Sequence, residues 1–303
     1  MTTPKYFLII GATGRQGSTV VNALLSHPTF HIHPSNVYAV TRDANGSGAS
    51  RLRSEYKGIN IVAGNLENPS EIFAQLDPKL ASQTGAYMAQ AHGPTELEEG
   101  KNFITAAAEH GISYFVYSSV DRGGRDLSDK DPSYCKTFSD KFYIEKHLLE
   151  VAESSSMDYT ILRPTWFADN AWWGFPGKLC MTGWRENMAG KRLQVTVTCG
   201  IGRWAAETFL DADKRGIRNQ ALSIASDELT FQEIDDIFMT HTGHGVPATY
   251  GFLARFIIWM VKDLSTMFGF IGERQYGANL DWLKTQIKPT TFKEWVEMDV
   301  PRS

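Results

Sequence analysis

The stretch KYFLIIGATGRQG, residues 5–17, constrains the fold of this chain more than any other. Its apolar run at residues 6–10 predicts a strand buried on both faces of a parallel sheet, because no alternate position is charged. Gly11, Gly14 and Gly17 follow at a spacing of three residues, and an apolar helical pattern begins after them. Strand, glycine-rich turn and helix in this order predict a dinucleotide-binding entry, in which the helix N-terminus binds a pyrophosphate.

Composition limits the classes of function. The 303 residues are 42% hydrophobic and carry a net charge of −4, which indicates a globular protein without the basic surplus of a nucleic-acid-binding one. The three cysteines lack metal-ligand spacing and favour a reducing compartment, so we expect a cytoplasmic location. His27, His31 and His33 lie among prolines without a nearby cysteine or carboxylate, so we expect no metal site.

The most hydrophobic later stretch, residues 251–270, contains Arg255, Lys262 and Asp263. Charged side chains inside an apolar segment make a membrane span costly. We therefore predict a core or interface helix here and expect no membrane insertion.

Further strands and helices alternate along the chain, which predicts an α/β fold with a doubly wound parallel sheet and a smaller C-terminal cap or substrate domain. The predicted strands cover residues 36–43, 59–64, 85–90, 112–119, 157–164 and about 221–226, and the main helices cover about 96–110, 138–150 and 203–215. The aromatic-rich segment after residue 164 differs from these units. We assign residues 1–164 and about 203–227 to the dinucleotide-binding domain, and about 165–202 and 228–303 to the cap.

The residue at the end of the second strand indicates which dinucleotide binds, because it contacts the adenosine ribose. Arg42 can pair with a 2′-phosphate, and Arg15 in the glycine-rich turn adds positive charge nearby, which favours NADP(H). Asp43 is the counter-argument, since a carboxylate turned toward the ribose would favour NAD. Asn65, after the third strand, can bond the adenine edge or serve as a turn residue.

Two further strand ends are expected beside the cofactor, since ligands bind at the carboxyl ends of strands in such sheets. The fourth strand ends near Met88 and Gln90, and the fifth ends at Ser118 and Ser119. The two serines are candidates to face the nicotinamide or the substrate, or they only end the strand.

Lys141 stands out on the helix at residues 138–150, because it shares the apolar stripe of Ile144 and Leu148. An ammonium inside such a stripe is unfavourable without a partner, so we interpret Lys141 as functional. The alternatives are that it reaches out to solvent or pairs with Glu145.

Four segments together resemble the NmrA-like family, a branch of the atypical short-chain dehydrogenases, most closely its fungal members. They are GATGRQG, TRD after the second strand, VYSSVDRGG with FSDKFYIEKHL behind it, and LRPTWFADN. The resemblance covers roughly residues 5–245 and implies a Rossmann domain, a small C-terminal substrate domain and bound NADP(H). It does not specify a substrate.

The resemblance also implies roles for individual residues. It places Lys141 at the nicotinamide ribose and Arg42 at the 2′-phosphate. The other implied cofactor contacts are the phosphate-lining Gly11, Thr13, Gly14, Arg15, Gln16 and Gly17, then Asn65 and Leu66 beside adenine, and Trp166, Phe167 and Asn170 closing over the nicotinamide.

One departure leaves the function open between two classes. Typical short-chain dehydrogenases have a tyrosine four residues before the lysine, where this chain has Thr137. Our first hypothesis is an NADPH-dependent reductase of a small molecule, with Lys141, Tyr134 or water as proton source and Ser118 or Ser119 assisting. The aromatic residues Trp166, Phe167, Trp172, Trp173 and Phe175 suggest a flat apolar substrate, such as an aromatic or polyketide-like carbonyl or enone, or plain cap packing. The alternative is a non-catalytic NADP(H) sensor that acts through a protein partner.

Overall fold

The computed structural model describes residues 3–172, 174–188 and 190–302. The chain forms two compact units. The first consists of residues 1–119, 140–163 and 201–222, and the second of residues 120–139, 164–200 and 223–303. Residues 120–139 thus fall in the second unit, whereas the sequence assigns them to the dinucleotide-binding domain. The short stretch after the fifth strand carries no apolar periodicity that would have indicated this.

A seven-stranded sheet organises the first unit, in the order β3-β2-β1-β4-β5-β6-β9. Its strands are β1 (Tyr6–Ile9), β2 (Val37–Thr41), β3 (Asn60–Ala63), β4 (Thr84–Met88), β5 (Tyr114–Ser118), β6 (Asp158–Pro164) and β9 (Gln220–Ile224). β1 pairs in parallel with both β2 and β4, so the strand order reverses beside β1. The predicted doubly wound parallel sheet is confirmed, and its switch point lies at the glycine-rich turn.

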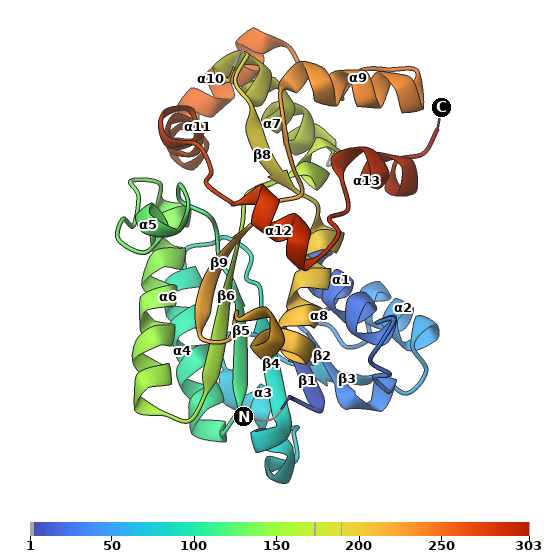
Figure 1. Cartoon of the computed structure of the whole chain (residues 1–303), viewed down its shortest axis with the longest axis vertical. Coiled ribbons are helices and arrows are strands. Elements are labelled where there is room, and N and C mark those ends of the chain that lie inside the picture. Colours follow the sequence, from blue (N-terminus) through green and yellow to red (C-terminus); the bar gives the residue numbers. More distant parts are fainter. Residues whose placement is uncertain (1–2, 173, 189, 303) are drawn as a thin grey trace. The chain divides into compact units, whose positions relative to one another are not determined.

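Helices cover both faces of this sheet (Figure 1). The main ones are α1 (Arg15–Leu25), α2 (Ser47–Glu55), α3 (Pro69–Phe73), α4 (Glu96–His110), α6 (Lys136–Ser154) and α8 (Thr198–Arg215), with short 3₁₀ turns η1 (Pro34–Asn36) and η2 (Pro78–Gln83). Leu8 and Ile10 pack with residues of α3, α4 and α6 on one face. Phe7 points to the other face and meets Phe209 of α8 at 5.4 Å between ring centroids. This alternation shows why the first strand is apolar on both sides.

The second unit contains a three-stranded sheet, β10-β8-β7, and several short helices. Its elements are β7 (Trp166–Phe167), β8 (Leu193–Thr196), β10 (Asp227–Leu229), η3 (Ala168–Trp172), α5 (Arg125–Ser128), α7 (Gly174–Asn187), α9 (Phe231–Thr242), α10 (Gly251–Met260), α11 (Lys262–Arg274), α12 (Leu280–Gln286) and α13 (Phe292–Asp299). Two helices of this unit begin with a capping box, formed by Thr230 and Glu233 at α9 and by Thr291 and Glu294 at α13. Its core is rich in aromatic rings, including Trp166, Trp184 and Phe268.

The stretch at residues 251–270 differs from the single helix predicted there. It forms α10 and the greater part of α11, which are separated at Val261, a residue with extended backbone angles. A new helix begins after Val261 with Asp263 in its first turn, where a carboxylate favours a helix start. None of the helices formed by the described residues has the length and apolar character needed to cross a membrane.

Candidate functional site

The glycine-rich turn between β1 and α1 has a backbone path that side chains would block. Gly11 has φ +69°, a conformation that residues with a Cβ rarely adopt. A Cβ on Gly17 would lie 2.2 Å from the carbonyl oxygen of Gly11, so α1 packs directly on the turn. Gly14 precedes α1 without any side-chain cap. A helix N-terminus that no side chain caps is suited to an anion such as a pyrophosphate.

The loop after β2 presents a cation. Arg42 is exposed, and no side chain or backbone group of the described residues bonds to its guanidinium. The neighbouring Asp43 turns back into its own loop, where Oδ1 accepts a hydrogen bond of 2.9 Å from the backbone N–H of Asn45. Thr13 Oγ1 lies 3.3 Å from Thr41 Oγ1, which joins the glycine-rich turn to the end of β2. The Asp43 carboxylate is thus engaged in its own loop, and a contact of Arg42 with the cofactor stays a prediction.

Gln16 ties the start of α1 to the ends of two strands. Its Oε1 accepts hydrogen bonds from Ser118 Oγ at 2.6 Å and from the Tyr87 hydroxyl at 3.2 Å. Both donors are buried, and burial raises the pKa of Tyr87 well above its ordinary value. The Ser118 hydroxyl, expected to face the nicotinamide or substrate, donates to the turn instead, which favours a role in positioning the turn.

Ser119 belongs to a separate buried network. Its hydroxyl donates to Glu145, which also accepts two hydrogen bonds from Arg163, at 3.1 Å from Nε and 2.7 Å from Nη2. All three side chains are buried. This network joins the end of β5 to α6 and β6, and it favours a structural rather than a substrate-binding role for Ser119.

Lys141 is paired with Glu96, not with the neighbouring Glu145 that the sequence offered as a local partner. Lys141 Nζ lies 2.8 Å from Oε1 of Glu96, at the start of α4. The other carboxylate oxygen, Oε2, lies 3.0 Å from Nδ1 of His92. Lys141 Nζ is also 5.8 Å from the centre of the Tyr117 ring, near the end of β5. The ammonium is therefore compensated by a fully buried carboxylate, and the functional role of Lys141 stays a prediction.

Gln90 completes this group from the β4 side, since its Nε2 donates to the backbone carbonyl of Glu96 at 3.0 Å. In the part of the chain that the structure describes, one group of metal-type ligands comes together, formed by His92, Glu96 and Asp140 with ligand atoms within 4.8 Å. The Lys141 ammonium, however, already compensates the charge of Glu96. The arrangement is thus an ion-paired amine linked to a histidine.

Sequence reasoning missed Glu96 and His92. Glu96 opens α4 together with Glu98 and Glu99, and acidic residues in a first helical turn are explained by the helix dipole alone. The available signal was the i,i+4 spacing of His92 and Glu96, which lie between the end of β4 and the body of α4. The contact of Glu96 with Lys141 joins α4 to α6, and a single sequence does not show such a long-range pairing.

Three other expected contacts have local roles in the structure. Asn65 Oδ1 accepts hydrogen bonds from the backbone N–H groups of Glu67 at 3.0 Å and Asn68 at 3.2 Å, which is the turn role that the sequence left open. Leu66 packs against the core, and Met88 is buried within it. A direct contact of these side chains with adenine or nicotinamide stays a prediction.

The aromatic segment of the second unit packs into that unit's core. The Trp166 ring lies 5.5 Å from the ring of Phe268 and 6.4 Å from that of Trp184. Phe167 and Asn170 are partly buried, Phe175 is exposed, Trp172 is described only as part of η3, and Trp173 lies outside the described residues. The packing explanation therefore accounts for Trp166. Closure over a nicotinamide stays a prediction.

Tyr134, a candidate proton source, belongs to the second unit. Its side chain is exposed, and its hydroxyl donates to Glu273 at 3.1 Å. Partial burial and the nearby carboxylate raise the pKa of Tyr134, which makes the phenol a weaker acid.

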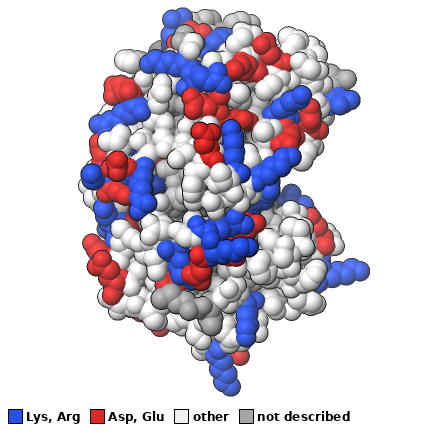
Figure 2. Space-filling model, viewed as in Figure 1, with Lys and Arg blue, Asp and Glu red and all other residues white. Residues whose placement is uncertain are grey.

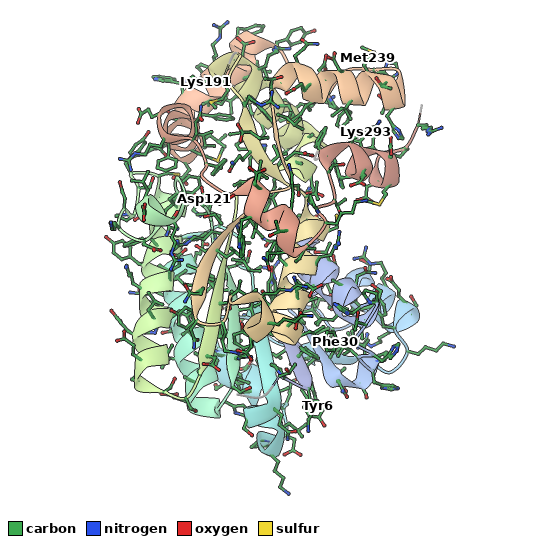
Figure 3. All side chains as sticks on the ribbon, viewed as in Figure 1. Tyr6, Phe30, Asp121, Lys191, Met239 and Lys293 are labelled. Atoms are coloured by element: carbon green, nitrogen blue, oxygen red, sulfur yellow. The ribbon has the colours of Figure 1, made fainter. Side chains whose placement is uncertain are left out.

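The VDRGG segment contains Asp121, which is labelled in Figure 3 and belongs to the second unit. The Asp121 carboxylate accepts hydrogen bonds from Ser223 and from the backbone N–H groups of Gly124 at 3.1 Å and Gly277 at 2.8 Å. Gly124 has φ +83°, and a Cβ there would lie 2.9 Å from the Gly277 carbonyl oxygen. This motif is therefore explained by the close approach of two loops around a buried carboxylate.

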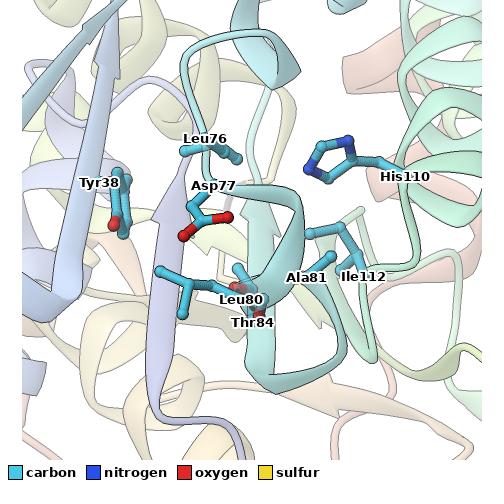
Figure 4. A pocket seen from close by; sticks show the side chains of 8 residues that line it. All are labelled: Tyr38, Leu76, Asp77, Leu80, Ala81, Thr84, His110 and Ile112. Atoms are coloured by element: carbon cyan, nitrogen blue, oxygen red, sulfur yellow. Dashed lines mark hydrogen bonds between the residues drawn. The ribbon is translucent and has the colours of Figure 1, made fainter.

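Two cavities are lined by residues other than those described above. The first is lined by residues such as Tyr38, Thr84 and His110 at the amino ends of the strands, and its volume of about 10 Å³ holds no more than a water molecule (Figure 4). The second is an open groove of about 420 Å³ between α9 and α13. Neither contains the Lys141 group.

A family model described as the NmrA-like family matches residues 3–299. The chain belongs to the NmrA-like family. Among curated relatives, the NmrA-like oxidoreductase FrzB from Cladobotryum sp is 27% identical over 175 residues, or 54% of this chain and 46% of FrzB. The NmrA-like oxidoreductase himF from Aspergillus japonicus is 26% identical over 78% of this chain and 72% of himF. The alignment with FrzB thus spans about half of that protein.

Solved structures share the fold. The triphenylmethane reductase of Citrobacter sp., complexed with NADP(H), gives a TM-score of 0.68 at 16% identity and covers 97% of this chain and 100% of that one. The NADPH-dependent quinone oxidoreductase QOR2 of Escherichia coli, complexed with NADPH, gives 0.70 at 18% identity and covers 96% and 98%. At these identities the likeness extends to the fold of this NmrA-like protein.

Proposed function

We propose that this protein is an NADP(H)-dependent reductase of a carbonyl or enone in an apolar, flat small molecule. The observation that carries the proposal is the Lys141–Glu96 pair, a primary ammonium held by a buried carboxylate near the end of β5. A proton source at a strand end is what carbonyl reduction requires, because negative charge develops on the substrate oxygen as hydride arrives.

The residues around the glycine-rich turn support NADP(H) as the cofactor. The turn has no Cβ at Gly11, Gly14 or Gly17, and a side chain at Gly17 would strike the backbone. Arg42 is exposed and would meet the 2′-phosphate, and Asp43 is engaged in its own loop. The two NADP(H)-bound reductases that share this fold add support by analogy.

The nicotinamide of a bound NADPH would supply the hydride. Lys141 Nζ would then give a proton to the substrate oxygen. Lys141 would thus take the role of the tyrosine that typical short-chain dehydrogenases have at the position of Thr137. Glu96 would hold the ammonium in place, and His92, on the exposed side of the same carboxylate, would link the group to solvent protons. Hydride to carbon and proton to oxygen together account for the reduction.

Cofactor choice is tested by calorimetry with NADP(H) and NAD(H). We expect the wild type to bind NADP(H) at least about tenfold more tightly, or about 1.4 kcal/mol. Arg42→Ala should remove most of this difference, because the 2′-phosphate loses its charged partner. The exposed Arg53→Ala, on the neighbouring helix α2, is the control and should keep the preference. Equal wild-type affinities for both dinucleotides would refute the assignment.

Catalysis is tested by NADPH consumption with a panel of ketones, enones and quinones. Lys141→Met should lower kcat by roughly two orders of magnitude with a smaller loss of NADPH affinity. The double variant Lys141→Met with Glu96→Leu should show the same loss without an uncompensated carboxylate. Lys146→Met, on the same helix with its ammonium 5.1 Å from the Phe142 ring centre, should keep turnover.

The alternative function, a non-catalytic NADP(H) sensor with a protein partner, gives a different result. A sensor would bind NADPH and yet consume none with any member of the panel, and Lys141→Met would change cofactor affinity alone. Full turnover in Lys141→Met would instead reject Lys141 as the proton source and direct attention to Tyr134 or water.

A further inference from the structure

Helix α10 exposes a row of aromatic side chains. Phe252, Phe256 and Trp259 follow one another at helical spacing and are 71%, 55% and 74% exposed. Tyr250 and Met260, at the two ends of the row, are exposed as well. The opposite side of α10 is also apolar, because Ala254 and Ile258 are buried in the core of the second unit. Ala254 and Ile258 already attach α10 to the second unit, so the packing of this helix does not require the aromatic residues on its outer side.

The exposed area exceeds what an ordinary monomer surface shows. A large aromatic side chain offers about 150–250 Å². With the exposed fractions of these residues, the row presents apolar surface on the order of 700 Å², whereas the largest patch on a typical monomer is about 300–600 Å². Surfaces of this kind mark interaction sites, so a partner of matching chemistry is needed.

The charged residues beside the aromatic row indicate the chemistry of its partner. The exposed ionisable residues between Tyr250 and Lys262 are Arg255, within the aromatic row, and Lys262, directly after Val261. Arg255 forms an ion pair of 4.0 Å with Glu186 of α7 and is still 68% exposed, and Asp263 is partly buried. A second copy facing this row across a two-fold axis would bring like charges together. An anionic bilayer attracts both cations and accepts tryptophan, tyrosine and phenylalanine at its headgroup level.

We propose that α10 is a peripheral docking helix for anionic membranes, which lays Phe252, Phe256 and Trp259 into the headgroup region. A helix that lies in the interface buries its apolar face by roughly 5–10 Å and does not span the bilayer. Its ten residues suit such a position. This inference does not depend on the proposed reductase function, because it rests on residues of the second unit alone.

Flotation of the full chain with phosphatidylcholine vesicles, with and without added phosphatidylserine, tests the proposal. We expect binding at least tenfold stronger to the anionic vesicles, with a blue shift of tryptophan emission. Phe252→Ser, Phe256→Ser and Trp259→Ser combined should reduce binding at least tenfold. Arg255→Gln and Lys262→Gln should each reduce it about fivefold on anionic vesicles and little on neutral ones.

The control is Met239→Ser on α9, another exposed apolar residue, which should leave vesicle binding unchanged (Figure 3). Unfolding temperatures of all variants should stay close to the wild type, since the substituted side chains are exposed. No binding to anionic vesicles by a folded wild-type chain would overturn the proposal. A two-chain particle without lipid, made monomeric by the triple substitution, would also overturn it and assign the row to a dimer interface.

Discussion

Glu145 and Glu96 are both buried carboxylates of the first unit that pair with a cation, yet their surroundings differ. Glu145 and Arg163 are each only 3% exposed and meet through two hydrogen bonds. Glu96 is fully buried, whereas its partner Lys141 is 12% exposed and meets it through one contact of 2.8 Å. The first pair is closed on all sides, and the second opens through the lysine and through His92.

We expect this difference to distinguish a pair with a structural role from a pair with the proposed functional role. An arginine stays protonated in proteins and presents a fixed planar group, so the closed pair is suited to holding α6 against β6. A lysine ammonium is a compact charge on a flexible stem, and the partial exposure of Lys141 leaves it open to the substrate that we propose. Burial of an ion pair therefore says little about function, whereas the identity and access of the cation say more.

The variant Arg163→Met gives the strongest test of the difference between the two ion pairs. Removing one partner of a closed buried pair should lower the free energy of unfolding by about 3–5 kcal/mol, because the Glu145 carboxylate is left uncompensated. Chemical denaturation measures the loss. Turnover per folded molecule should stay near the wild-type value, since this pair lies outside the proposed chemistry.

The matched control for that variant is Arg192→Met, whose partner Glu233 lies 3.0 Å away on the surface. Both side chains of this pair are well exposed, so the loss should be below about 1 kcal/mol. A large loss of turnover in folded Arg163→Met would contradict the division into a closed structural pair and an open functional pair.

Substitutions in the Glu96–Lys141 pair should cost less stability than those in the Glu145–Arg163 pair. A double-mutant cycle measures the coupling between Glu96 and Lys141. We expect Lys141→Met and Glu96→Leu each to cost about 2 kcal/mol of stability, less than the closed pair because water reaches the lysine. The double variant should cost less than the sum of the two, with a coupling of about 1–3 kcal/mol. Additive effects would show that the two side chains do not interact in solution, and the proposed holding role of Glu96 would be lost.

Sequence reasoning succeeded where the signal is local. The glycine-rich turn follows from backbone geometry, helix α4 covers the predicted residues 96–110, and Thr230 and Thr291 open their helices as the capping pattern indicates. Lys141 was singled out because a charge in an apolar stripe needs a partner, and the structure pairs it with Glu96; its functional role stays a prediction. For the turn and for the helix starts, the deciding interaction lies within a few residues of the motif.

It failed where the deciding contact joins distant segments. Glu96 and Lys141 lie on different helices, and an acidic first turn already has a sufficient local explanation. The VDRGG segment was grouped with the first unit, although Asp121 bonds to Ser223 and Gly277 in the second. The break at Val261 was missed because apolar residues continue on both sides of it.

The smallest stability contribution is expected from an exposed carboxylate, Glu233, and the pH dependence of stability measures it. The backbone N–H of Thr230 donates to Glu233 at 2.7 Å, and this bond, with the nearby Arg192, holds the pKa of Glu233 below its usual value. A carboxylate whose pKa is lower in the folded state adds stability above its unfolded pKa, and this contribution disappears as the pH falls through the lower folded value. Glu233→Gln keeps a hydrogen-bond acceptor and removes the charge.

We therefore expect Glu233→Gln to lower the free energy of unfolding by less than about 1 kcal/mol near neutral pH, because solvent screens an exposed charge. The difference from the wild type should vanish in acid, once the wild-type carboxylate is protonated. Glu294→Gln at the start of α13 should behave in the same way, since Thr291 lowers the pKa of Glu294 by the same backbone bond. A loss as large as that of Arg163→Met, or one that persists in acid, would mean that exposure does not set the strength of these carboxylate contacts, and the contrast between the closed and open pairs would need another cause.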